Sequence, residues 1–425
     1  MYKKKVEKKR RMNDEISRAK DLAGVYNNFS VSPLKTEEEF EKFYVPRLTS
    51  SVEGIKERIE SSQKNERYIF MGFRGSGKST ELYRLMNSLN RDRFYPVFFD
   101  IFEFLDMNDF DYREFFASIA LYLYDSVIEL IDIKEEIRKD FEEFIMDVTK
   151  VEESEVLKER GLGLTLEKFI VAKLGTEAKT RKVTRKNLEN RITDLMVKLN
   201  DLIIEIESSL EKKVVIIIDG LDKLSRFKQA ENFFYNNYRL LTQVNCHAIY
   251  TFPIDLAYSP RFQIIRHAFD EDLVLPQPPV RTKNLERVYK KGFEFYRAIA
   301  EKRINMELIE ENALKEAIIS TGKLTEFMLT IREAAIRSSG LQKETIGLEE
   351  VKFSLEKLRR TYDRTLTVEE LKRLIEIHDK KEARDIEIGD SVVRNLLFSL
   401  TAVEYESEDE GKWCEVNPLL FPLMK

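Results

Sequence analysis

The stretch Gly72-Phe-Arg-Gly-Ser-Gly-Lys78-Ser79 decides how this chain of 425 residues folds. It matches the phosphate-binding pattern G-x-x-x-x-G-K-[ST] at every fixed position, and the apolar run 67–71 before it is typical of a buried strand. Glycines are needed because backbone N–H groups must close around phosphate oxygens, where a β-carbon would block the approach. The stretch therefore predicts a strand, a loop that binds a nucleoside triphosphate, and a helix whose N-terminus faces the anion.

The loop residues and their flanks are candidate contacts of the nucleotide. Lys78 supplies positive charge for the β- and γ-phosphates, and Ser79 is expected to ligate Mg²⁺ through its hydroxyl. The set predicted from this motif is Gly72, Arg74, Gly75, Ser76, Gly77, Lys78, Ser79 and Thr80. A chance match on an unrelated loop is the alternative, and the strand-like and helix-like stretches on either side argue against it.

A second motif supplies the carboxylates that hydrolysis requires. The run Lys213-Val-Val-Ile-Ile-Ile-Asp219-Gly-Leu-Asp222 contains five consecutive β-branched residues, which are typical of a central strand in a parallel sheet covered on both faces. Asp219 ends this strand at the carboxyl edge, where it would hold Mg²⁺ through water. Asp222 would polarise the attacking water, unless it only caps the segment that follows. Asp100, at the end of another predicted strand, is a further acid near this site.

Together the two motifs resemble those of the STAND class of signalling ATPases, a branch related to AAA+ proteins and to origin-recognition ATPases, here of prokaryotic type. The resemblance covers about residues 34–425 and is most specific at the two motifs. It implies that the chain binds ATP with Mg²⁺ and hydrolyses it. ATP is expected rather than GTP because nothing in the sequence looks like the guanine motif Asn-Lys-x-Asp.

Two shorter stretches agree with this resemblance. Phe43-Tyr-Val-Pro46-Arg47 is similar to the segment that precedes the nucleotide domain in such ATPases, which implies that Pro46 and Arg47 border the adenine and ribose. The stretch 246–254 resembles the next core strand and carries Thr251 where a polar sensor of the γ-phosphate is expected. The resemblance thus adds Thr251 to the catalytic set of Lys78, Asp219 and Asp222.

The resemblance leaves the regulatory arginines open. Residues 320–334 are similar to the helical-lid segment that carries a second sensor, but Thr325 occupies the expected arginine position, so Lys323 or Arg332 would have to replace it. Arg261 and Arg266 follow the Thr251 strand, where ring-forming relatives place an arginine that reaches a neighbouring subunit. Ordinary surface ion pairs are the alternative for both.

Composition limits the class of protein, its location in the cell and the metals that it would bind. The chain has 43% hydrophobic and 35% charged residues, which predicts a soluble globular protein of two or three domains. It contains no run of about 18 apolar residues and no apolar core of a secretory signal near its start, so we expect a cytoplasmic protein without a membrane span. Cys246 and Cys414 are expected to be buried thiols, and three scattered histidines predict no metal cluster. Nucleotide-bound Mg²⁺ is the one metal expected.

We therefore predict an α/β fold, a P-loop NTPase parallel sheet with a helical insertion, a helical lid and a C-terminal winged helix. The predicted parts are a basic tail and leader (1–33), the ATPase domain (34–280) with its insertion at about 109–210, the lid (281–362) and the winged helix (363–425).

Basic and amphipathic segments have two interpretations each. The tail 1–11 carries seven basic residues and would either grip nucleic acid or remain solvated. The stretch 176–186 offers Lys179, Arg181, Lys182, Arg185 and Lys186 for the same contact, or forms a solvated connector. This stretch and Gly161-Leu-Gly163 are the predicted flexible points. The apolar stripe 184–210 packs against the domain's own helices or against another protomer.

The charge of the predicted wing indicates which kind of partner it would bind. The predicted wing contains Glu404, Glu406, Glu408, Asp409 and Glu410, and the preceding helix offers Arg394 as its base. Acidic groups repel a phosphate backbone, so the wing predicts protein docking or autoinhibition rather than DNA binding.

Our hypothesis is an ATP-controlled switch that regulates a separate effector protein, forms a homo-oligomer on activation, and serves signalling or antiphage defence. The alternative is a DNA-binding AAA+ ATPase of the origin-recognition or transposition-regulator type, for which nucleic acid would be a ligand. A scaffold that binds ATP without turnover is disfavoured because Lys78, Ser79, Asp219 and Asp222 are all present.

Overall fold

The computed structural model describes residues 18–49, 51–151, 166–224, 227–285, 287–383 and 391–424. The basic tail 1–11 and the predicted flexible point at Gly161 and Gly163 lie outside these residues. The chain divides into two compact units. Unit 1 comprises residues 1–51, 72–84 and 275–425, and unit 2 comprises residues 52–71 and 85–274. The phosphate loop therefore belongs to unit 1, together with the N-terminal and C-terminal parts of the chain.

Unit 2 is built on a five-stranded parallel sheet with the strand order β2-β3-β4-β1-β5. The strands are β1 (Arg67–Met71), β2 (Phe94–Asp100), β3 (Lys213–Asp219), β4 (His247–Phe252) and β5 (Glu271–Val274). β3 is buried from Val214 onward and β4 along its whole length, as expected for strands covered on both faces. β2 and β3 pair in register with Asp100 opposite Asp219, so both acids end their strands at one edge. The predicted parallel sheet is confirmed.

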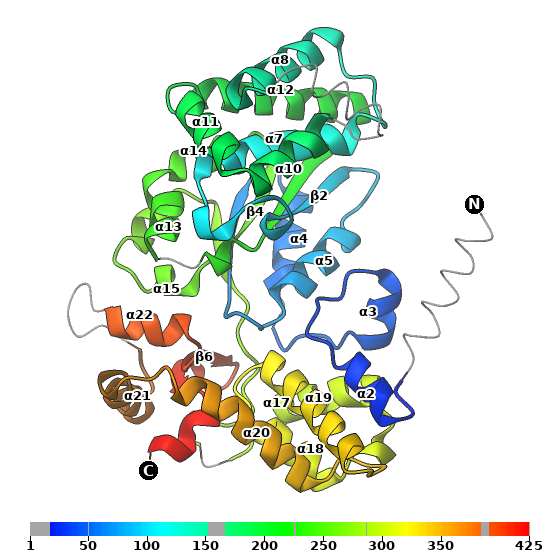
Figure 1. Cartoon of the computed structure of the whole chain (residues 1–425), viewed down its shortest axis with the longest axis vertical. Helices are drawn as coiled ribbons and strands as arrows, with labels where there is room; N and C mark the ends of the chain where they lie inside the picture. Colours follow the sequence, from blue (N-terminus) through cyan, green and yellow to red (C-terminus); the bar gives the residue numbers. More distant parts are fainter. Residues whose placement is uncertain are drawn as a thin grey trace. The chain divides into compact units, whose positions relative to one another are not determined.

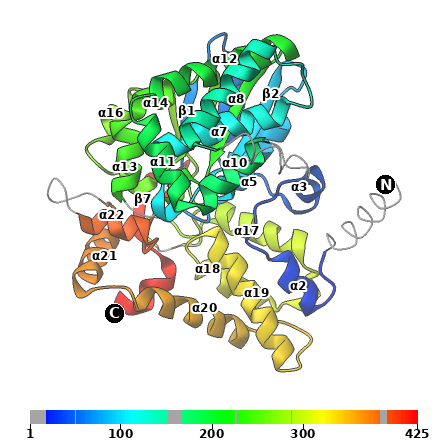
Figure 2. The same cartoon turned by 45° about the horizontal axis from the view of Figure 1, so that its top comes forward.

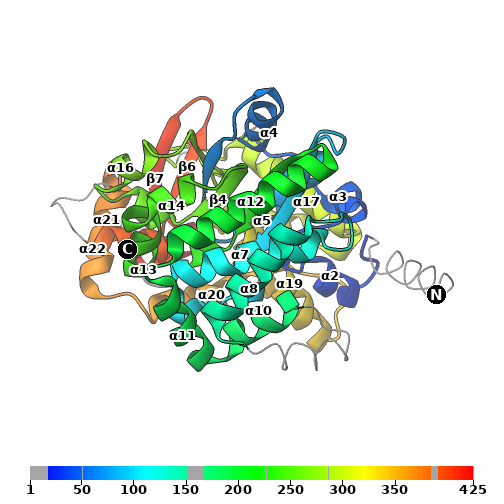
Figure 3. The same ribbon diagram turned by 90° about the horizontal axis from the view of Figure 1, so that it is seen from above.

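Between β2 and β3 the chain forms the predicted helical insertion. Its elements are α6 (Ile101–Phe104), η1 (Met107–Asp109), α7 (Tyr112–Val127), α8 (Glu135–Thr149), α10 (Leu166–Thr176), α11 (Ala178–Leu188) and α12 (Ile192–Leu210). Figure 2 shows these helices gathered together, and Figure 3 shows α12 beside α7. Leu195, Leu199 and Ile206 of the predicted apolar stripe are buried. The stripe therefore packs against the protein's own helices.

Two of the five basic residues of α11 form ion pairs inside the insertion. Arg181 is buried and donates to Asp106 and Asp109 at 3.3 Å each, while Arg185 donates to Glu114 Oε1 at 2.7 Å. These pairs connect α11 to the start of the insertion across more than 70 residues of sequence. Arg181 and Arg185 thus hold the insertion together, because a buried guanidinium needs carboxylate acceptors. The stretch is therefore a helix held to the insertion and not a solvated connector. Lys179, Lys182 and Lys186 are exposed, and their contact with nucleic acid stays a prediction.

Shorter helices complete unit 2. They are α4 (Ser51–Ser61), the second half of α5 (Lys78–Ser88), η2 (Leu221–Lys223), α13 (Phe227–Glu231), the π-helical turn η3 (Asn232–Asn236), α14 (Tyr238–Thr242), α15 (Ile254–Ala257) and α16 (Phe262–Arg266). Phe234 packs edge-on against Phe252 of β4 with ring centroids 4.6 Å apart. This aromatic contact fixes the η3 turn on the sheet.

The lid helices of unit 1 share one hydrophobic core with the N-terminal segment (Figure 1). The elements are α2 (Leu22–Asn28), α3 (Glu37–Phe43), α17 (Lys290–Arg303), η4 (Met306–Leu308), α18 (Glu311–Ile319), α19 (Leu324–Gly340) and α20 (Leu348–Asp363). Val25 of α2 and Phe29, which caps the end of that helix, are four residues apart and both buried. The Phe29 ring contacts the ring of Phe327 in α19. The leader thereby becomes part of the lid.

Residues 367–424 follow the predicted winged-helix order. Helices α21 (Val368–Lys380) and α22 (Ser391–Phe398) precede an antiparallel hairpin of β6 (Ala402–Ser407) and β7 (Gly411–Val416), and η5 (Pro418–Met424) ends the chain. Tyr405 and Trp413 stand opposite each other in the hairpin and both are buried. Wing residue Glu408 pairs with Lys291, and Glu410 Oε2 accepts from the Lys283 backbone at 2.9 Å. Two of the five wing acids therefore face the lid of the same unit.

Both cysteines lie in the interior of the protein. Cys246 and Cys414 are buried thiols that form no disulfide with each other, as predicted. Burial raises the pKa of the Cys246 thiol because the thiolate would be poorly solvated. Among the described residues, no helix is long and apolar enough to cross a membrane.

A pH-dependent stability follows from His247 on β4. Its ring is buried, its Nδ1 accepts from the Glu66 backbone at 3.2 Å, and burial lowers its pKa to about 4. The folded state therefore binds fewer protons than the unfolded chain between about pH 6.5 and pH 4. Stability present above pH 6.5 should be lost as the pH falls through this window, by roughly 3 kcal/mol in total. Urea unfolding at pH 7 and pH 4 measures this loss.

Two variants separate this effect from general acid sensitivity. His247→Gln should show a smaller loss between the two pH values, because glutamine does not titrate. His267→Gln, at an exposed position on the same unit, should behave like the parent. Equal losses in all three proteins would contradict the assignment.

Candidate nucleotide site

Three features of the backbone form the phosphate loop directly after β1. Gly75 and Gly77 have φ angles of +76° and +93°, the left-handed region that L side chains rarely adopt. Ser76 N donates to Phe73 O at 3.1 Å, which closes the turn, and α5 begins at Lys78. The loop therefore has the geometry that its glycines predict, with backbone N–H groups gathered at a helix N-terminus.

The predicted lysine lies on this loop. Lys78 is 5% exposed, and its Nζ donates to Gly72 O at 2.7 Å and to Phe73 O at 2.9 Å. These carbonyls hold the ammonium over the loop, where phosphate oxygens would compete for it. Ser79 and Thr80 follow in the first turn of α5, and Thr80 Oγ1 accepts from Leu34 N at 3.2 Å. The leader segment thus contacts the start of this helix.

Arg47 also lies against the loop. Its side chain is 6% exposed, its Nη2 donates to Ser76 O, and a β-carbon added at Gly77 would overlap that same nitrogen. Nη1 is buried and has no hydrogen-bond partner among the described residues. The predicted contact of Arg47 with adenine and ribose stays a prediction, and its neighbour Pro46 is exposed. The guanidinium adds positive charge beside the phosphate loop.

A buried carboxylate that the sequence analysis did not single out holds Arg47 in place. Glu81 of α5 is 1% exposed and accepts from Arg47 Nε at 3.3 Å, Arg84 Nε at 3.0 Å and Tyr44 Oη at 3.2 Å. Burial and the Glu81 charge raise the pKa of Tyr44, which keeps its hydroxyl a donor. The signal in the sequence was an acid one turn after Lys78, but exposed glutamates are common there.

Two contacts bring the rest of unit 1 to the loop. Thr325 Oγ1, at the start of α19, donates to Gly75 O at 2.9 Å. The Arg74 guanidinium lies over the ring of Phe398 in α22, 4.2 Å from its centroid. The lid and the winged helix each contact one residue of the phosphate loop.

The candidate replacements for the lid arginine point elsewhere. Lys323 Nζ donates to Tyr362 Oη at 2.8 Å and lies 3.4 Å from Glu326, and burial lowers its pKa. Arg332 stacks on Tyr26 of α2, 4.0 Å from the ring centroid. Thr325 is thus the residue of this segment that contacts the loop.

In unit 2, the second motif forms a tight turn after β3. Asp219 and Asp222 are 3% and 5% exposed, and Asp219 Oδ1 accepts from Gly220 N at 2.8 Å. Thr251 of β4 lies beside them: its Oγ1 accepts from Leu221 N at 3.0 Å and donates to Ile218 O at 3.2 Å. The structure therefore brings together Thr251 and the acidic turn, which the sequence placed 30 residues apart.

Asp100, at the same edge of the sheet, caps a helix. Its Oδ1 accepts from Phe102 N at 3.1 Å, which makes Asp100 the N-cap of α6. Arg261 and Arg266 both make ion pairs within unit 2, with Glu231 and Asp272 respectively. These are the surface pairs that the sequence left as the alternative to a role at a neighbouring subunit.

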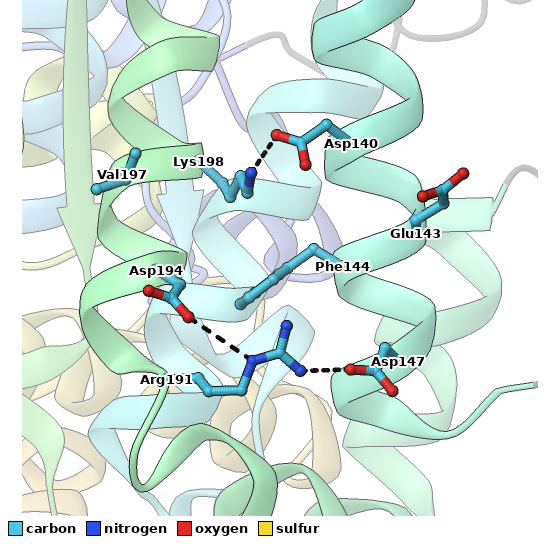
Figure 4. Close-up of a pocket in the computed structure, with 8 residues that line it drawn as sticks. All are labelled: Asp140, Glu143, Phe144, Asp147, Arg191, Asp194, Val197 and Lys198. Carbon is cyan, nitrogen blue, oxygen red and sulfur yellow. Dashed lines mark hydrogen bonds and ion pairs between the residues drawn. The ribbon is translucent and has the colours of Figure 1, made fainter.

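A separate hollow of about 450 Å³ lies between α8 and α12 of the insertion (Figure 4). It is lined by Asp140, Glu143, Phe144, Asp147, Arg191, Asp194, Val197 and Lys198. Lys198 pairs with Asp140, and Arg191 pairs with Asp147 and with Asp194. Ion pairs thus cross this hollow from helix to helix, and none of its residues belongs to a nucleotide motif.

Some solved structures resemble this chain at low TM-scores. No protein-family model and no curated protein matches the sequence. The Aeropyrum pernix ORC2 protein in its ADPNP-ADP complexes has a TM-score of 0.42 at 10% identity, over 91% of this chain and 95% of that one. The Aeropyrum pernix ORC1 protein in complex with DNA has 0.40 at 13% identity, over 88% and 89%. The Thermotoga maritima RuvB Holliday junction branch migration motor has 0.37 at 11% identity, over 90% and 95%. Similarity at this level does not assign a family.

Proposed function

We propose that this chain is an ATP-binding and ATP-hydrolysing switch of the AAA+ type, which regulates a partner protein. The observation that carries the proposal is the phosphate loop itself. Its glycines have positive φ angles, α5 begins at Lys78, and both Lys78 and Arg47 lie on the loop. Two buried or nearly buried cations beside converging N–H groups are suited to a polyphosphate and to few other ligands.

Each predicted site residue has a role in this proposal. Ser79 and Asp219 would hold Mg²⁺, which supplies charge neutralisation for the phosphates when bound. Asp222 would accept the proton of the attacking water, since it is buried on the turn that follows β3. Thr251 would keep that turn in place through its two backbone bonds. Arg74 and Thr325 would couple the loop to the winged helix and the lid.

Titration calorimetry tests the nucleotide directly. We expect Mg-ATP to bind the full chain with one site, and Mg-GTP to bind at least tenfold more weakly. Release of inorganic phosphate should then be slow but measurable. Absence of Mg-ATP binding at millimolar concentration would overturn the proposal.

The partner is inferred from charge. Residues 363–425 contain 15 acidic and 9 basic residues, a balance that repels a phosphate backbone and suits a basic protein surface. The second candidate is a DNA-binding ATPase of the origin-recognition type. It is favoured by the winged-helix order of α21, α22, β6 and β7, and by the engagement of Glu408 and Glu410 with the lid.

A charge variant distinguishes the two candidates. Glu406→Gln with Asp409→Asn removes two wing charges while keeping the Glu408 and Glu410 contacts. We expect unchanged basal ATPase activity and weak duplex DNA binding by the parent at moderate salt, rising slightly in the variant as repulsion falls. Fluorescence anisotropy over a salt series measures this. Tight binding by the parent that is lost in Arg394→Ala would establish the DNA-binding candidate instead.

A further inference from the structure

We infer that Glu326 is a positioning residue for the phosphate loop, and that it links the winged helix to that loop. Its carboxylate holds the first turn of α19, and with it Thr325, against Gly75. This inference rests on the proposed function, because positioning of the loop affects nucleotide affinity only where the loop binds nucleotide.

Thr325, in the first turn of α19, contacts the phosphate loop at Gly75. Thr325 Oγ1 and its backbone N both point to Gly75 O, at 2.9 Å and 3.4 Å. There is no space between them, because a β-carbon added at Gly75 would overlap Thr325 Oγ1. The peptide plane after Gly75 is therefore oriented by Thr325, and that plane carries the Ser76 N–H of the loop.

Glu326, the next residue, is 2% exposed and accepts hydrogen bonds from three segments of unit 1. Gly322 N, in the turn before α19, lies 2.9 Å from Oε2. Tyr362 Oη of α20 and Asn417 Nδ2, just after β7, lie 2.6 Å and 2.8 Å from Oε1. Lys323 Nζ lies 3.4 Å from Oε1 and balances the charge. A buried carboxylate also needs hydrogen-bond donors, so loss of one of them leaves its oxygens less well satisfied and favours movement of α19.

The winged helix supplies part of this attachment. Asn417 is itself fixed, because its Nδ2 also donates to Leu400 O at 3.1 Å and its Oδ1 accepts from Leu419 N at 3.1 Å. Tyr405 of β6 donates through Oη to Gly322 O at 3.0 Å. A β-carbon at Gly322 would lie 2.7 Å from Asn417 Oδ1, so the two segments are in direct contact. Displacement of the winged helix therefore removes the Asn417 donor from Glu326 and loosens Thr325.

The test compares Glu326→Gln, Thr325→Ala and the double variant in the full chain. An amide has one acceptor oxygen in place of two, so Glu326→Gln loses part of the attachment while keeping the shape. We expect each single variant to bind Mg-ADPNP at least fivefold more weakly by calorimetry. The double variant should be no weaker than the weaker single one, because both act through the same contact. Amide hydrogen exchange of residues 72–79 without nucleotide should be faster in all three.

Glu350→Gln is the matched control. Glu350 of α20 is also 2% exposed, pairs with Lys343 and accepts from Gly347 N at 3.2 Å, but has none of the contacts described above. It should lower the melting temperature without changing ADPNP affinity or loop exchange. A residue with a merely structural role would behave like this control.

The outcomes separate the two proposals. Failure of the parent to bind ADPNP would refute the proposed function, while loop exchange would still report on positioning. Binding by the parent with unchanged affinity and unchanged exchange in Glu326→Gln would overturn the inference, as would additive losses in the double variant. If Glu326→Gln does not fold, Tyr362→Phe and Asn417→Ala each remove one of the donors to Glu326 and must show the same two changes.

Discussion

Lys78→Ala should weaken Mg-ATP binding by at least tenfold, which corresponds to about 1.4 kcal/mol, and should reduce turnover by at least as much. The reason is geometric as well as electrostatic. The ammonium is held over the loop by Gly72 O and Phe73 O, so it meets the phosphates without rearrangement of the backbone. Titration calorimetry with Mg-ATP and a phosphate-release assay measure the two quantities.

Lys352→Ala serves as the control for this prediction. Lys352 is an exposed lysine of α20 that pairs with Glu349, so its loss should leave both quantities unchanged. The melting temperature of Lys78→Ala should be at least that of the parent, because a buried cation is removed. Unchanged affinity together with unchanged turnover in Lys78→Ala would exclude this loop as the nucleotide site.

Asp222→Asn should separate binding from chemistry. We expect Mg-ATP to bind with an affinity within threefold of the parent, while single-turnover hydrolysis falls by about a hundredfold, in the range of a lost general base. The amide keeps the shape of the buried side chain but cannot accept a proton. Rapid-quench measurement of phosphate release, with enzyme in excess over ATP, measures the chemical step alone.

A second buried acid of unit 2 serves as a control, because it tests whether the slower hydrolysis of Asp222→Asn comes only from a less stable fold. Glu205 of α12 is 4% exposed and pairs with Lys134, so Glu205→Gln should destabilise the fold without slowing hydrolysis. Hydrolysis in Asp222→Asn at the parent rate would assign water activation to another residue. Asp100 would be the next variant, although its carboxylate already caps α6.

The local parts of the fold were predictable because their signals are short. The glycines at 75 and 77 encode a left-handed backbone by the absence of a side chain, and the β-branched run 214–218 encodes a central strand. Each of these patterns is complete within about ten residues, so no long-range contact was needed to infer it.

Charged side chains were harder to interpret. The stretch 176–186 was expected as a solvated connector or a nucleic-acid contact, yet Arg181 is buried against Asp106 and Asp109. Composition records that a residue is basic, but it does not record which acids the fold places beside it. The same holds for the wing, where Glu408 pairs with Lys291 and Glu410 accepts from the Lys283 backbone.

The sequence alone determined the phosphate loop, the acidic strand end and the order of the domains' elements, since each depends on neighbours along the chain. The tertiary structure decided what surrounds the loop. Arg47 and Glu81 meet across 34 residues, and Glu326 and Asn417 across 91. Such contacts arise when packing brings distant segments together and buried charges require partners, and no periodicity or motif spacing encodes that choice.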